Sequence, residues 1–209
     1  MSEIQVNTIN EYTGANGVTI DGVLVKDSVA HSGLVKLQSS TLSGGSEFLF
    51  DNVFTSDYRD YKIFFSDIQP ASDQMFNMIF RTGGASGSNL TGTYGRGFWL
   101  YKPFAASGSS SYGVGSDDKF TDLMRISGNN IGSGTNETGQ GEMTIYNPLS
   151  TTSHKMFVGN LIYHRGGSSD IESCMFNGAI QSTTAVTGVK FLANSGNISG
   201  TIDIYGVKV

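Results

Sequence analysis

The chain has 209 residues, of which 28 are glycine and three are proline, and charged residues make up only 15% of it. Ordinary globular proteins have about 7% glycine and about 25% charged residues. The net charge is −5, so the sequence lacks the basic character of a nucleic-acid-binding protein. With 38% hydrophobic residues the chain is too apolar to be disordered, and its single cysteine excludes an intramolecular disulfide framework. We therefore expect a glycine-rich, all-β protein with many tight turns.

The first 37 residues differ from the rest because they contain almost no aromatic residue. Two short extended runs are separated by the polar turn at 13–17, and neither can bury a core. We expect residues 1–37 to be an extended attachment and oligomerisation segment that needs a partner surface or copies of itself. The apolar residues predicted to dock are Ile4, Val6, Ile9, Val18, Ile20, Val23 and Val25.

The remaining residues, 38–209, predict one antiparallel β-sandwich of the jelly-roll type. Aromatic-rich runs recur between clusters of glycine, serine and asparagine, and no stretch keeps a helical spacing of ten residues or more. The expected strands are 47–54, 58–65, 75–81, 97–101, 120–126, 142–146, 156–163, 171–181, 188–192 and 198–209.

Two long irregular stretches, 83–97 and 105–119, interrupt this pattern and are expected to be loops. Aromatic rings beside polar side chains suit sugar binding, because a ring face stacks on the sugar while polar groups bind its hydroxyls. The candidate contacts to a host-surface glycan are Tyr94, Trp99, Tyr112, Asp117 and Asp118. Trp99 also fits a strand buried on both faces, and the two aspartates also fit a solvated loop or a Ca²⁺ site.

The sequence has no recognisable catalytic or cofactor motif. His154 and His164 could meet on paired strands and bind a metal, but no carboxylate completes a ligand set at a known spacing. Cys174 lies in a strand pattern, where a buried, inert thiol is favoured over a nucleophile. We therefore expect no enzymatic activity, no cofactor and no metal. The longest apolar runs are too short to span a membrane, and the first residues carry no secretory signal, so no membrane insertion is expected.

Three regions resemble the fibre-like virion proteins of marine tailed bacteriophages. Val6-Asn7-Thr8-Ile9 and the run from Gly17 to Asp27 are similar to the opening of their tail-fibre and head-fibre proteins. The region from Phe50 to Ile63 is similar to the first hairpin of a β-sandwich in those proteins. The closing residues 200–209, ending Tyr-Gly-Val-Lys-Val, are similar to their last strand.

The resemblance implies a structural component of a phage particle, assembled in the host cytoplasm and located in the virion. It implies a homotrimer that docks by its N-terminus on other proteins of the tail or capsid and presents the sandwich outward, as a tail fibre or spike. The alternatives are a capsid decoration protein without a receptor role, a carbohydrate-binding module outside any virus, and an enzyme such as a depolymerase.

Overall fold

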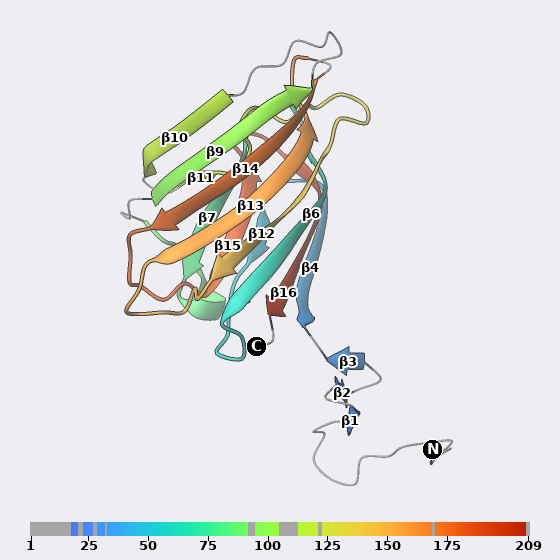
Figure 1. Ribbon diagram of the computed structural model, residues 1–209. Helices are drawn as coiled ribbons and strands as arrows, with labels where there is room; N and C mark the ends of the chain where they lie inside the picture. The colour runs from blue at the N-terminus through green and yellow to red at the C-terminus, as the bar shows by residue number, and fades with distance from the viewer. Residues whose placement is uncertain are drawn as a thin grey trace, which may run out of the picture.

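The computed structural model describes residues 18–20, 23–26, 29–31, 33–91, 95–104, 113–120, 123–168 and 170–207. For the strands within 18–31, 95–104 and 113–120 it describes the backbone alone. Strands make up 59% of the chain, and two antiparallel sheets pack against each other (Figure 1). The predicted all-β sandwich is therefore confirmed.

The larger sheet has eight strands in the order β10-β9-β14-β13-β12-β6-β16-β4. Their bounds are β4 (Leu34–Gly45), β6 (Asp60–Pro70), β9 (Gly95–Phe104), β10 (Gly113–Phe120), β12 (Gly139–Tyr146), β13 (Lys155–His164), β14 (Ile171–Ile180) and β16 (Ile198–Val207). The sheet is a meander from β12 to β14, whereas β6 and β16 are brought together from distant parts of the chain.

The smaller sheet has five strands, in the order β11-β7-β15-β5 with β8 paired to β7. Their bounds are β5 (Phe48–Phe50), β7 (Phe76–Thr82), β8 (Ser88–Asn89), β11 (Met124–Arg125) and β15 (Gly188–Ala193). A single turn of 3₁₀ helix, η1 (Gly84–Ser86), joins β7 to β8.

The core lies between the two sheets, and alternate residues of strands such as β13 and β16 point into it. In β16, Ile198, Ile202 and Ile204 are fully buried, as the period-2 alternation predicts. Aromatic rings fill the centre: the ring of Phe65 from the larger sheet packs edge-on against Phe191 of the smaller sheet, with centroids 5.2 Å apart. Burying each such ring contributes about 1.5–3 kcal/mol to folding.

The sandwich has a proximal and a distal end. At the proximal end, where the chain enters the larger sheet, Val207 of β16 lies between Leu34 of β4 and Asp60 of β6 and is paired with both. At the distal end Pro70 is opposite Ile198. The eleven residues of β6 connect the two ends, which are therefore about 35 Å apart.

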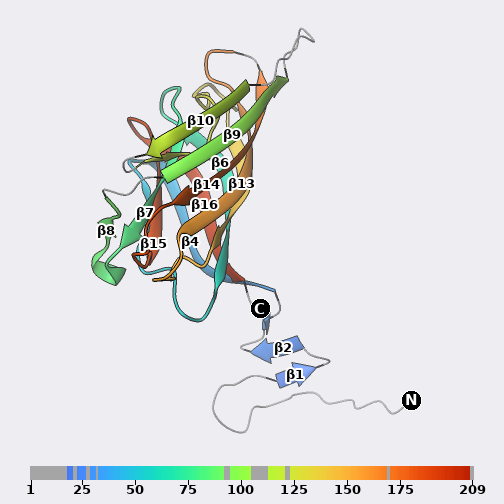
Figure 2. The same ribbon diagram turned by 60° about the vertical axis from the view of Figure 1, so that its left-hand side comes forward.

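A separate three-stranded antiparallel sheet precedes the sandwich, formed by β1 (Val18–Ile20), β2 (Val23–Lys26) and β3 (Val29–His31). It lies beyond the proximal end in both views, close to where the chain terminates (Figures 1 and 2). The proposed boundary at residue 37 stays a prediction, and β4 runs without interruption across it from Leu34.

Three local expectations differ from the structure. Residues 34–45 form the edge strand β4, which the sequence analysis did not identify, because its apolar residues are few and only half-buried. The expected strand 120–126 is two elements: β10 ends at Phe120 and β11 covers only Met124–Arg125. The expected loop 105–119 contains most of β10, which lies at the edge of the larger sheet.

Candidate interaction surfaces

The outer surface of the larger sheet exposes large apolar side chains on three adjacent strands. Met156 is 57% exposed and Met175 is 62% exposed. We call this surface the outer apolar face, and it consists of Tyr146, Met156, Val158, Ile162, Ile171 and Met175. It arises because β13 carries apolar residues at both its inward and outward positions, so that one set is buried and the other is left to solvent.

Strand register places these side chains next to one another across the sheet. Tyr146 is opposite Met156, and Met175 is opposite Asn160. A hollow of about 250 Å³ lies beside Asn160 and Met175, and Val158 also lines it. An ion pair from Lys62 to Glu142, with Nζ and Oε1 2.6 Å apart, borders the same hollow.

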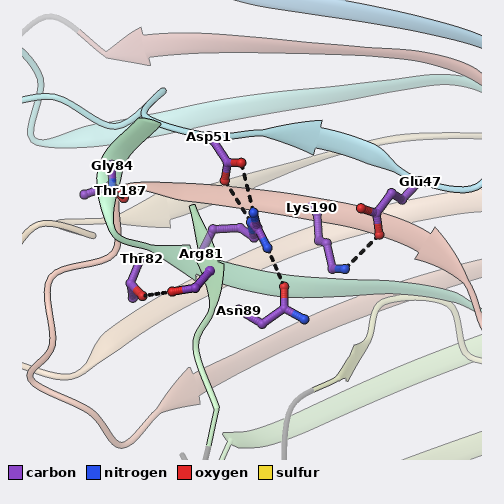
Figure 3. A network of polar contacts seen from close by, with 9 residues as sticks. Glu47, Asp51, Arg81, Thr82, Gly84, Asn89, Thr187 and Lys190 are labelled. Atoms are coloured by element: carbon purple, nitrogen blue, oxygen red, sulfur yellow. Dashed lines mark hydrogen bonds and ion pairs between the residues drawn. The ribbon is translucent and has the colours of Figure 1, made fainter. Parts of the chain in front are cut away.

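The outer surface of the smaller sheet is different, because charged side chains there are paired with one another (Figure 3). Arg81 donates two hydrogen bonds to the Asp51 carboxylate, at 2.8 and 2.9 Å, and a third to Asn89 at 2.7 Å. Lys190 pairs with Glu47 at 2.7 Å. The Asp51 carboxylate raises the pKa of Arg81 above its ordinary value through this hydrogen bonding. This face therefore satisfies its polar groups internally, whereas the outer apolar face leaves apolar groups uncovered.

A second surface feature is a cavity of about 380 Å³ at the distal end, which we call the distal pocket. It opens where β7 begins, where β15 ends, and beside β11. Its lining residues are Gln74, Met75, Asn77, Leu123, Arg125, Asn130 and Asn194. Four of these seven are amides, which is an unusual concentration of one functional group.

Cys174 is fully buried, as the sequence analysis predicted. Burial raises the pKa of its thiol to about 12, so the thiolate needed for nucleophilic chemistry is not formed near neutral pH. The possibility that His154 and His164 meet is excluded: His164 ends β13, and His154 lies just before its first residue, so the strand separates them. Among the residues that the structure describes, no group of three or more histidine, cysteine or acidic side chains could hold a metal ion.

The predicted docking residues fall in the N-terminal sheet or outside the described residues. Val18 is opposite Val25, and Ile20 is opposite Val23, in the pairing of β1 with β2. The other three, Ile4, Val6 and Ile9, lie outside the described residues.

The predicted glycan contacts are only partly placed. Tyr94 and Tyr112 lie outside the described residues, and Trp99 is in β9 with its backbone opposite Phe176. Asp117 and Asp118 are in the strand β10 and not in a loop. The roles assigned to these five residues stay predictions.

Sequence reasoning missed both surfaces described above. Apolar residues at every position from Met156 to Val158 were a signal for a strand with two apolar faces, but not for which face lies open. The distal pocket had no local signal, because its amides come from three separate segments. In the described part of the chain, no helix is long and apolar enough to cross a membrane.

Comparison of the chain with protein-family models, with curated proteins and with solved structures finds no match.

Proposed function

We propose that the chain is a structural virion protein of a tailed bacteriophage, a trimeric fibre-like or spike-like component. In this proposal the N-terminal segment docks on the tail or capsid, and the sandwich projects from the particle. The observation that carries the proposal is the outer apolar face, together with the resemblance of the chain termini to fibre-like virion proteins.

An exposed apolar face of this kind favours contact with another protein surface. Methionines that are 57% and 62% exposed leave apolar area in water that association would remove. The three strands that carry the outer apolar face, β12, β13 and β14, lie about 4.8 Å apart and are about 30 Å long, so this face covers roughly 430 Å². A stable interface needs about 800 Å² from each partner, so the outer apolar face would supply about half of such an interface and neighbouring surface the rest.

We assign a second copy of the same chain as the occupant of this face. The N-terminal sheet supports self-association, because a unit built from three strands of only three or four residues is too small to bury a core of its own. Copies of the chain brought together at the N-terminal segment would hold their sandwiches close to one another. The high effective concentration would then favour contact through the outer apolar faces.

The test is the mass of the purified chain by light scattering after size exclusion. We expect about three times 22.3 kDa for the intact chain. Met175→Glu places a charge in the outer apolar face and should shift the mass toward that of a monomer. Leu49→Glu is the matched control, since Leu49 is also exposed, at 42%, but lies on the smaller sheet opposite Lys190.

A monomeric intact chain would contradict the trimer and favour a carbohydrate-binding module or a decoration protein that orders only on the capsid. A trimer that Met175→Glu leaves unchanged would show that the outer apolar face is not the contact.

A further inference from the structure

The distal pocket is formed by segments held together by backbone hydrogen bonds. The amide of Gln74 donates to the carbonyl of Ile131 at 3.3 Å, and the amide of Ile131 donates back to Gln74 at 2.8 Å. The amide of Asn194 donates to the carbonyl of Met75 at 3.0 Å. The pocket is therefore preformed, and its volume of about 380 Å³ falls within the range of roughly 300–1,000 Å³ found for small-molecule sites.

Its side-chain amides are available to a ligand. The side chains of Gln74, Asn130 and Asn194 make no hydrogen bond to any of the described residues, and these three residues are held in place through their backbone groups. Asn77 is different: its Nδ2 donates to the carbonyl of Met75 at 3.0 Å, which fixes the floor of the pocket.

The chemistry of the lining fits a neutral, hydroxyl-rich ligand. Each amide offers two N–H donors and one carbonyl acceptor, and each sugar hydroxyl both donates and accepts. Met75 and Leu123 add an apolar wall for the C–H surface of a sugar ring. The described lining contains no carboxylate, and its one cation, Arg125, already takes part in an interaction within the chain. A divalent cation or a highly charged anion is therefore a poorer match than a saccharide.

The position of the pocket also suits a ligand outside the particle. It lies at the distal end, about 35 Å along β6 from the end at which the N-terminal segment joins the sandwich. A protein anchored by that segment presents the distal end to whatever its particle meets.

We infer that the distal pocket is a saccharide-binding site in which the amides of Gln74, Asn130 and Asn194 bind sugar hydroxyls. This inference rests on the proposed function, because it identifies the host-surface ligand of a virion fibre protein as a neutral saccharide. It places that contact on residues other than the aromatic and acidic residues suggested by the sequence.

The experiment uses the full chain, fluorescently labelled, on a printed array of bacterial lipopolysaccharide and capsular saccharides. The double variant Gln74→Ala/Asn194→Ala removes two amides whose side chains make no hydrogen bond within the described chain, so we expect it to fold. Asn197→Ala is the matched control, because Asn197 is exposed at the same end but does not line the pocket. We expect the intact chain and Asn197→Ala to bind at least one saccharide, and the double variant to bind it at least tenfold more weakly.

Failure of this inference and failure of the proposed function give different results. If the array shows no bound saccharide, or if the double variant binds as well as the intact chain, the saccharide site is overturned. Light scattering on the same samples reports the trimer separately. If the intact chain is a trimer but binds no saccharide, only the saccharide inference is overturned. If the intact chain is a monomer that binds a saccharide, and the double variant loses this binding, only the trimeric fibre is overturned.

Discussion

The hydroxyl of Tyr163 donates a hydrogen bond to the carboxylate of Glu172, and neither side chain is more than 1% exposed. Asn129 completes the arrangement: its Nδ2 donates to the other carboxylate oxygen at 3.0 Å, and its backbone amide donates to the Tyr163 hydroxyl at 2.8 Å. The network links β13 and β14 of the larger sheet to the loop after β11. Burial and the adjacent carboxylate raise the pKa of Tyr163, so its hydroxyl stays a donor at neutral pH.

Tyr163→Phe should therefore destabilise the sandwich. The change removes one donor from a buried carboxylate and one acceptor from the Asn129 amide, which costs about 1–3 kcal/mol. Urea unfolding, monitored by fluorescence, measures the free energy of unfolding of the variant and of the intact chain. The control is Tyr58→Phe, because no hydrogen bond of the Tyr58 hydroxyl is found among the described residues; equal losses in the two variants would show that the network contributes nothing specific.

Cys174→Ala should change the pH dependence of stability. The folded-state pKa of the thiol is about 12, raised from 9.0 by burial. Above pH 9.0 the unfolded chain loses this proton while the folded chain keeps it, so the stability present below pH 9.0 falls as pH rises toward 12. The expected slope from this one group is about 1.4 kcal/mol per pH unit. The stability advantage of the intact chain over Cys174→Ala should shrink accordingly between pH 9 and 11 in urea titrations, and parallel curves would contradict the buried thiol.

Gly159→Ala should be strongly destabilising even though alanine is small. A Cβ at this position would lie 2.3 Å from Cζ of Phe176 and 2.6 Å from the backbone oxygen of Glu142. Such overpacking costs about 1–3 kcal/mol. In the double variant with Phe176→Leu, part of that loss should be recovered, because the ring contact is relieved while the backbone contact remains. Thermal unfolding of the two single variants and the double variant gives a double-mutant cycle. If their losses of stability simply add, the contact between the new Cβ and the Phe176 ring is excluded as a cause.

Lys155→Met should destabilise the proximal end. The fully buried ammonium of Lys155 donates to the carbonyls of Ser150, Ser153 and Ser182 at 2.5, 3.0 and 3.2 Å. Burial lowers the pKa of this lysine, yet the three carbonyls need its donors, and losing them costs about 1–3 kcal/mol. Lys36→Met is the control, since that lysine pairs with Asp203 at the exposed edge and should change stability far less. Chemical denaturation measures the free energy of unfolding of both variants. If Lys155→Met loses less of it than Lys36→Met, the three carbonyl contacts do not stabilise the fold as expected.

Deleting residues 1–27 should separate attachment from folding. The deletion removes all of β1 and β2, but leaves β4 intact, which begins at Leu34. We expect the truncated chain to keep its circular dichroism spectrum and melting temperature while failing to be incorporated into particles. An unfolded truncated chain would show that the N-terminal segment belongs to the sandwich.

The sequence by itself predicted most of the strands, because alternation and turn residues act over a few neighbouring positions. Ile202 and Ile204 in β16 illustrate this, since their spacing alone places them on one buried face. Strand β4 was missed because its local pattern is weak: only Leu37 and Leu42 among its leucines pack against the core, and glutamine, serine and threonine occupy the positions between them. Its pairing with β16, more than 150 residues later, is what makes it a strand.

The two proposed surfaces depended on tertiary structure. The amides of Gln74, Asn130 and Asn194 are about 60 residues apart in sequence and meet only because three connections reach the same end of the sandwich. Likewise, the sequence shows that β13 is apolar on both faces, but only the packing of the smaller sheet against one face leaves Met156 and Val158 exposed on the other. Local sequence determines which segments are extended and which side chains share a face; long-range pairing decides which face is buried and which residues meet.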